Sequence, residues 1–311
     1  MRLDWDEHWT RLWRHQPALW VLTAALAVLG AATAWASVRG AQQQAAWMYD
    51  AFLRAQAANE PPDTRAFVAL SGWQSLSVLL GLVMLALDVL VYWTVGLAFE
   101  HPERPLPWYA PWRRAWVPWL RALLAHVLRS LALGLAATVL FLPLTLVLVL
   151  AVFVCSPVPV VLALWVLSVW LVWWLLPWWV NWIVAAVLEH PAGPPEVWRR
   201  YWGVMKTYRD DFRPLAGMHL ALLVFVIGPA QALAVYPWLA MVVRGDPWAR
   251  PPEVPPWVWV AAPLLGALGW GALAYVKVGW ASAYGWASRA WRANIQRLAA
   301  ARRASTEVSH E

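Results

Sequence analysis

Apolar runs of about twenty residues or more recur along the chain from Ala18 to Ala287. One such run crosses the roughly 30 Å hydrocarbon core of a bilayer as a single helix, because an α-helix rises about 1.5 Å per residue. Only 13% of the residues are charged, against roughly 25% in soluble domains. The pattern predicts an all-α polytopic membrane protein and disfavours a soluble enzyme, a secreted factor or a nucleic-acid module.

Windows of about 19 residues predict six transmembrane helices in repeated hairpins. Polar or helix-breaking clusters separate them, among them Arg39-Gly40, Glu100-His101-Pro102 and Glu189-His190-Pro191. Prolines inside the spans predict kinks. The spans cover residues 17–37, 67–99, 120–152, 159–188, 214–243 and 257–288, and the prolines are Pro143, Pro177, Pro229, Pro237 and Pro263.

The distribution of Lys and Arg gives the expected orientation. The N-terminus, the segments 100–129 and 189–213, and the C-terminus together carry 18 of these residues, whereas the opposite side carries five. By the positive-inside rule both termini are cytoplasmic. We expect a bacterial cytoplasmic (inner) membrane protein whose basic face contacts anionic lipid headgroups, with a possible protein partner in a membrane complex and no nucleic acid.

Three parts follow from this prediction. Residues 1–16 form a cytoplasmic amphipathic interfacial helix, since Trp5, Trp9 and Trp13 recur every four residues with charges between them; packing of this helix against the spans is the alternative. Residues 17–288 form the six-helix transmembrane domain, and residues 289–311 form a basic cytoplasmic tail.

An internal repeat occurs at an offset of 89 residues, around residues 93–130 and 182–220. Each copy is a helical hairpin that ends in Glu-His-Pro, followed by a proline-rich connector and a Trp-Arg-Arg-x-Trp helix. The motifs are Trp93-x-Val95-x4-Glu100-His101-Pro102 with Trp112-Arg113-Arg114-Ala115-Trp116, and Trp182-x-Val184-x4-Glu189-His190-Pro191 with Trp198-Arg199-Arg200-Tyr201-Trp202.

A glutamate at a helix C-terminus is unfavourable, because the helix dipole presents negative charge there. Two glutamates at matching positions therefore need partners. We expect a clamp in which each pairs with an arginine of the following helix; the alternative is that Glu-His-Pro is only a solvated stop signal. The expected pairs are Glu100 with Arg113 or Arg114, and Glu189 with Arg199 or Arg200.

This arrangement resembles a loose group of bacterial polytopic membrane proteins of unknown function, together with the membrane domain attached to some glycerophosphodiester phosphodiesterases. In them a span also ends in an acidic residue, followed by a short amphipathic Arg-Arg and aromatic segment and another span. The resemblance covers about residues 90–220 and rests on the clamp residues named above. In the phosphodiesterases the catalytic barrel is a separate soluble part, for which this chain has no room. The resemblance therefore implies a membrane fold, and hydrolase activity is not carried over from it.

Two fully charged residues fall deep inside predicted spans, Asp88 and Lys277. Each lies twelve residues, about 18 Å, from the cytoplasmic end of its span. An isolated charge at that depth is costly, so we expect an intramembrane ion pair. The pair either locks two spans together or lines the path of a substrate or proton.

Tryptophan is unusually frequent, with 29 residues. Trp170, Trp174, Trp178 and Trp182 recur every four residues and predict an aromatic face on one span. Such a face packs against neighbouring helices or acyl chains, or binds a lipid tail, quinone or pigment.

No motif identifies a reaction. Cys155 is the only cysteine, and no CxxC or HExxH spacing is present, so we expect no metal and no cofactor. The leading prediction is a non-enzymatic scaffold or accessory subunit of a membrane complex. The alternatives are a transporter whose path passes Asp88 and Lys277 and, third, a lipid-handling enzyme using Glu100, His101, Glu189 and His190.

Overall fold

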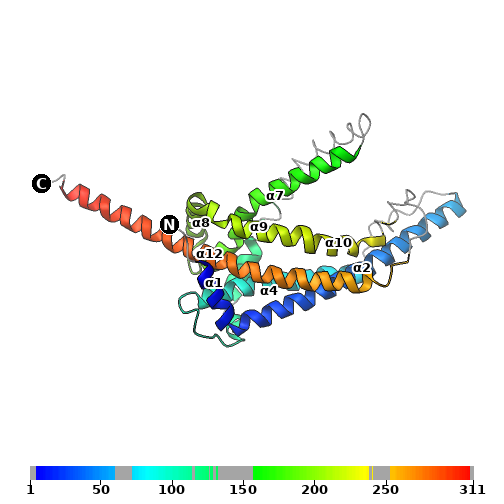
Figure 1. The fold of residues 1–311 in the computed structure, drawn as a ribbon, viewed down its shortest axis with the longest axis horizontal. Coiled ribbons are helices and arrows are strands. Elements are labelled where there is room, and N and C mark those ends of the chain that lie inside the picture. The colour runs from blue at the N-terminus through cyan, green and yellow to red at the C-terminus, as the bar shows by residue number, and fades with distance from the viewer. Residues whose placement is uncertain are drawn as a thin grey trace. The chain divides into compact units, whose positions relative to one another are not determined.

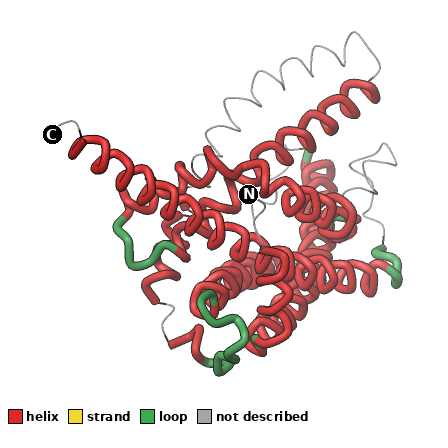
Figure 2. Tube along the Cα trace, turned by 60° about the vertical axis from the view of Figure 1, so that its left-hand side comes forward, coloured by secondary structure: helices red, strands yellow, loops and turns green. Residues whose placement is uncertain are grey.

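The computed structural model describes residues 5–59, 72–113, 116–125, 127–128, 131, 157–237, 240 and 253–308. These residues form helices joined by loops, without strands (Figure 2). Figure 1 labels the principal helices. In chain order the elements are α1 (Trp5–His15), α2 (Pro17–Ala58), α4 (Gly72–Ala98), α5 (Ala110–Arg113), α7 (Pro157–Leu188), α8 (Pro194–Tyr208), η1 (Arg209–Phe212), α9 (Arg213–Leu222), η2 (Leu223–Ile227), α10 (Gly228–Ala234) and α12 (Val258–Val308).

Five stretches of helix in the described part are long and apolar enough to cross a membrane. They confirm the all-α prediction and have the character of a multi-pass membrane protein. The predicted third span, 120–152, lies mostly outside the described residues, so the number of six spans stays a prediction. The five stretches are Pro17–Ala58, Gly72–Ala98, Val169–Leu188, Pro194–Ala234 and Val258–Ala301.

Two helices run well past their predicted ends. α2 continues through Arg39-Gly40 to Ala58, because the Ala- and Gln-rich sequence that follows is made of good helix formers. The Arg39 guanidinium stays next to the helix, 5.5 Å from the centre of the Trp35 ring and 4.4 Å from that of Trp259. α12 likewise continues beyond residue 288 to Val308, so the predicted tail is helical as far as that residue.

Prolines are accommodated in two ways. Pro177 and Pro263 lie inside α7 and α12, which continue through them. Before Pro229 the chain instead forms the π-helical turn η2, and the Gly228 N–H bonds to the Leu223 carbonyl, five residues back. Pro229 has no N–H to offer an α-helical bond, which favours such a wider turn.

The chain divides into two compact units. The first unit comprises Met1–Leu19, Val89–Leu220 and Val276–Glu311, and the second comprises Trp20–Asp88 and Ala221–Tyr275.

In the second unit, small residues bring α2 and α12 close together. A methyl group at Gly30 would lie only 2.6 Å from the Gly266 carbonyl oxygen, so the two backbones touch at these glycines. Small residues at helix contacts are typical of membrane proteins, where close packing takes the place of the hydrophobic drive. Beside this contact lies a buried cluster of Ala34, Val38, Ala234, Val254, Val258 and Ala262.

In the first unit, aromatic rings form the core around α12. Trp280 and Tyr284 are fully buried, and the Trp280 ring stacks on Phe212 with centroids 5.8 Å apart. Phe99 lies against the Cα of Gly285, where a methyl group would meet its ring at 2.1 Å. The last described turns of α4, the α8–α9 segment and α12 are thus held by ring contacts.

Candidate functional site

The two copies of the repeat adjoin in the first unit. α4 and α7 end at Ala98 and Leu188, just before the two Glu-His-Pro motifs. Gly96 lies so close to Leu188 that a methyl group at Gly96 would meet its Cδ2 at 2.8 Å. The Trp93 ring meets the His190 ring edge-on, with centroids 6.0 Å apart. Equivalent helix ends therefore lie beside each other.

Glu189 is a buried acceptor for two helices. Its side chain is 4% exposed, and it accepts a hydrogen bond from Arg200 Nη1 at 2.8 Å and another from the Ser288 hydroxyl. Arg200 Nε also donates to Glu196 at 2.7 Å, and Arg199 pairs with Glu196 rather than with Glu189. Both oxygens of Glu189 are therefore bonded, one to α8 and one to α12.

Glu100 is held differently. Its side chain is 71% exposed and pairs with Arg289 of α12, whose guanidinium lies 4.3 Å from the Phe99 ring centre. Of the partners expected from the sequence, Arg113 places its guanidinium over Tyr109 at 4.8 Å, and Arg114 lies outside the described residues. The contact of Glu100 with α12 arises because that helix continues past residue 288.

Consecutive residues of α12 thus contact both repeat glutamates. Ser288 bonds to Glu189, and Arg289 pairs with Glu100. We call these four residues the α12 clasp. It ties the ends of α4 and α7 to one helix that belongs to neither copy of the repeat.

Gln16, between α1 and α2, fixes the loop after the first Glu-His-Pro motif. Its fully buried amide donates to the carbonyls of Pro102 and Arg104, each at 2.8 Å, and accepts from the Leu106 N–H at 3.0 Å. A glutamine side chain supplies both donors and an acceptor. One side chain therefore replaces the backbone bonds that this proline-containing loop lacks.

The predicted aromatic face has two distinct halves. Trp170 and Trp174 are exposed. Trp178 and Trp182 pack against aromatic residues of α8, and the Trp182 ring meets Trp198 with centroids 4.7 Å apart. The half near the end of α7 packs against α8, whereas in the other half the Trp174 ring lies 5.7 Å from the Arg209 guanidinium of η1.

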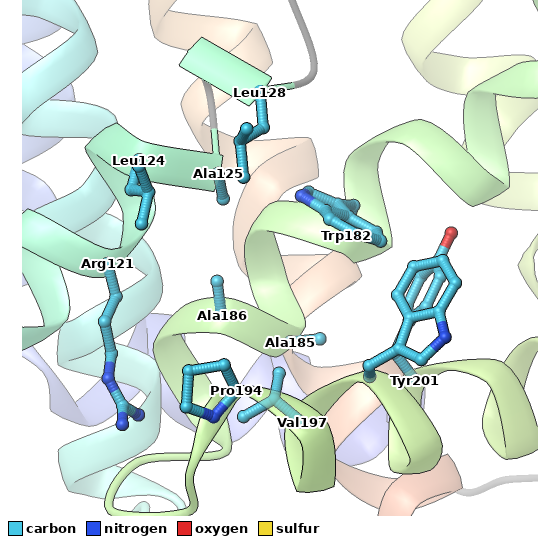
Figure 3. A pocket seen from close by; sticks show the side chains of 11 residues that line it. Arg121, Leu124, Ala125, Leu128, Trp182, Ala185, Ala186, Pro194, Val197 and Tyr201 are labelled. Atoms are coloured by element: carbon cyan, nitrogen blue, oxygen red, sulfur yellow. The ribbon is translucent and has the colours of Figure 1, made fainter. Parts of the chain in front are cut away.

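An apolar cavity of about 140 Å³ lies beside that packed half (Figure 3). It is bounded by residues 121–125 and 128, the last turns of α7 and the first turns of α8. Arg121 is the one charged residue among the described residues that line it. The principal lining side chains are Arg121, Leu124, Leu128, Trp182, Trp198 and Tyr201.

Arg121 is anchored at only one side. Its Nη2 donates to the Ala192 carbonyl at 2.7 Å, whereas its buried Nη1 has no hydrogen-bond partner among the described residues. The Tyr201 hydroxyl, by contrast, donates to the Trp178 carbonyl at 2.8 Å. A guanidinium carries five donors and is always charged, so Arg121 offers unused hydrogen-bonding capacity at the cavity.

The remaining predicted residues are placed as follows. Asp88 of α4 lies in the second unit and Lys277 of α12 in the first, and both side chains are buried; their pairing stays a prediction. His101 Nδ1 lies 3.7 Å from Glu103. Among the residues that the structure describes, no three His, Cys, Asp or Glu side chains are grouped to hold a metal ion.

Sequence reasoning missed four of the residues described above: Gln16, Arg121, Ser288 and Arg289. Arg121 and Arg289 entered only as positive charges in the topology count. The one usable signal was for Gln16, a polar residue directly before the Pro17 that begins an apolar helix. Ser288 carries no local signal, because its partner is 99 residues away.

Comparison of this chain with protein-family models, curated proteins and solved structures gives no match to any of them.

Proposed function

We propose that the protein is a non-enzymatic scaffold or accessory subunit of a membrane complex, and that the C-terminal part of α12 is its contact with a protein partner. The observation that carries the proposal is the length and surface of α12. Its 51 residues correspond to about 76 Å, against the roughly 30 Å of a bilayer core. A large part of the helix is therefore left to project from the membrane.

The projecting part has the surface of a docking helix. Ile295 and Leu298, three residues apart and so on one face, are 47% and 61% exposed, and Arg292 and Arg297 accompany them. On a helix that leaves the membrane, burial of apolar side chains against a partner is favourable, because it removes apolar surface from water. By the positive-inside rule, the basic residues of this segment support a cytoplasmic location for it.

The bonding of the repeat supports a structural role for its acidic residues. Glu189 is buried with both oxygens occupied, and Glu100 pairs with Arg289. A carboxylate bonded as Glu189 is holds helices together and has no free oxygen for a substrate, which a general acid or base needs.

Photo-crosslinking in native membranes tests the proposal. A photoreactive amino acid replaces Ile295 or Leu298 in the full-length protein, and Ala300, exposed on another face of the same helix, is the matched control position. We expect one discrete cross-linked protein from positions 295 and 298 and at least a tenfold lower yield from position 300. The adduct is identified by mass spectrometry.

The proposal is overturned if positions 295 and 298 give no protein adduct, or give the same mixture as position 300. An adduct with a second copy of this chain would replace an accessory role by self-association. The double variant Ile295→Ser with Leu298→Ser should lose the partner on mild detergent extraction while keeping the thermal unfolding midpoint of the unaltered protein.

A further inference from the structure

We propose that the cavity beside Arg121 is a binding site for one anionic glycerophospholipid, with the phosphate at Arg121 and an acyl chain between Leu128 and Trp182. The inference goes beyond the scaffold role. It depends on the membrane location of the chain and not on a partner at α12.

The position of the cavity matches the depth of a lipid. Trp182 lies six residues, about 9 Å, before the end of α7, so it falls inside the candidate span Val169–Leu188. Arg121 instead bonds to Ala192, beyond that end. The cavity therefore runs from the level of the headgroups into the hydrocarbon region, the direction in which a phospholipid lies.

The lining changes along the same direction. Figure 3 shows Arg121 at one end of the site, with Leu124, Ala125 and Leu128 following it toward Trp182. Leu128 follows Arg121 by seven positions in the sequence. The part of the site that lies away from Arg121 is lined by apolar side chains, which suit methylene groups.

Two side chains that line the cavity carry unused hydrogen-bond donors. Arg121 Nη1 has no hydrogen-bond partner among the described residues, and neither has the buried Nε1 of Trp182. A phosphate pairs with a guanidinium through two parallel hydrogen bonds. An ester carbonyl, which follows the phosphate in a glycerolipid, accepts from an indole N–H. Positive charge at the mouth thus selects an anionic lipid.

One side of the site is open to an approaching lipid. Leu124, Leu128 and Trp198 line the cavity and are all exposed. An apolar rim of this kind lies against acyl chains in a bilayer. A lipid can therefore enter laterally, without an opening of the helix packing at Glu189.

Native mass spectrometry of the full-length protein tests the site. The probes are phosphatidylglycerol and phosphatidylcholine with identical acyl chains. We expect one retained phosphatidylglycerol, at least tenfold tighter than phosphatidylcholine. The variant Arg121→Met should abolish this preference, and Arg113→Met, which removes an exposed arginine of the same basic region, should leave it unchanged.

A second variant covers the possibility that Arg121→Met disturbs the loop at Ala192. Ala186→Leu fills the cavity from α7 without altering any charge, and it should weaken phosphatidylglycerol at least tenfold at an unchanged unfolding midpoint. The site is overturned if Arg121→Met and Ala186→Leu both retain phosphatidylglycerol as the unaltered protein does. It is also overturned if Arg113→Met loses as much phosphatidylglycerol as Arg121→Met.

The acyl chain is tested separately from the phosphate. Glycerol phosphate, which has no tails, should not displace phosphatidylglycerol at a hundredfold excess, whereas displacement would overturn the lipid assignment in favour of a phosphate site. Displacement by a fatty acid at equal concentration would overturn the phosphate contact. None of these results depends on cross-linking from α12, so failure here is distinguishable from failure of the scaffold proposal.

Discussion

Ser288 and Glu189 lie 99 residues apart in the chain and are joined by a hydrogen bond from the serine hydroxyl to the buried carboxylate. Arg200 holds the other oxygen of the same carboxylate. A carboxylate that is removed from water in this way requires both partners, because an unpaired buried charge is strongly destabilising. The two repeat glutamates should therefore contribute unequally to stability, since only Glu189 is buried.

Glu189→Gln should destabilise the protein by about 1.5–3 kcal/mol, the range for hydrogen bonds to charged groups. The substitution leaves Arg200 with only one of its two carboxylate partners, Glu196. The matched change Glu100→Gln breaks an exposed pair and should cost at most about 1 kcal/mol. Unfolding followed by tryptophan fluorescence in detergent measures both, and equal losses would contradict the assignment.

Gly30→Ala should destabilise the second unit by about 1–3 kcal/mol, the cost of overpacking. The added methyl group would meet the Gly266 carbonyl oxygen at 2.6 Å and the Trp270 Cδ1 at 2.5 Å. Backbone cannot move aside as a flexible side chain does. Gly81→Ala is the control, because nothing lies within 4 Å of its added methyl; it should be neutral or stabilising by up to about 1 kcal/mol. The same unfolding midpoint distinguishes the two.

The docking of α1 should weaken in acid. Burial lowers the pKa of His8 below its usual 6.5, against the opposite effect of the hydrogen bond to the Phe99 carbonyl, and the positive charges of Arg289 and Arg11 lower it further. The folded state therefore favours the neutral ring. The neutral His8 ring contributes fully to the stability of the docked α1 above about pH 6.5. This contribution is lost as the pH falls through the lowered pKa.

Hydrogen exchange of the α1 peptide should accordingly rise between pH 7.5 and 5.5, after correction for the intrinsic rate. His8→Gln keeps a donor for the Phe99 carbonyl and cannot titrate, so its exchange should not respond to pH. His15→Gln changes an exposed histidine of the same helix and should preserve the response. A response that persists in His8→Gln would assign the effect to another group.

Cysteine labelling tests the expected orientation. In a Cys155→Ser background, Ala57→Cys and Glu103→Cys introduce single exposed thiols on opposite sides of the predicted membrane. A membrane-impermeant maleimide should label Ala57→Cys in spheroplasts with an intact cytoplasmic membrane. It should label Glu103→Cys only after this membrane has been permeabilised. The reverse pattern would invert the orientation.

Hydropathy was sufficient to predict the helices around Leu26, Leu87 and Leu273. Long apolar runs indicate helices without any knowledge of tertiary contacts. Helix ends were predicted less well. Arg39-Gly40 has the composition of a stop, yet α2 continues through it, since Arg39 folds back onto Trp35 and Trp259. Sequence rules for helix ends take no account of a contact with another helix, such as that of Arg39 with the Trp259 ring.

The repeat allowed Glu100 and Glu189 to be singled out as residues in need of partners. The unfavourable interaction of a negative charge with a helix C-terminus can be recognised from the nearby sequence alone. The identity of the partners does not always follow from the nearby sequence. Arg200 follows Glu189 by eleven residues, which sequence reasoning can reach. Arg289 follows Glu100 by 189 residues, and no periodicity connects them.

The α12 clasp has a consequence for biosynthesis. At about 5–20 residues per second, a ribosome needs roughly 5–20 s to reach Ser288 after Glu189 and roughly 10–40 s to reach Arg289 after Glu100. Throughout that interval both acidic helix ends lack their contacts with α12. The ends of α4 and α7 are therefore synthesised before their clasp can form, and the synthesis of α12 is the event that completes it.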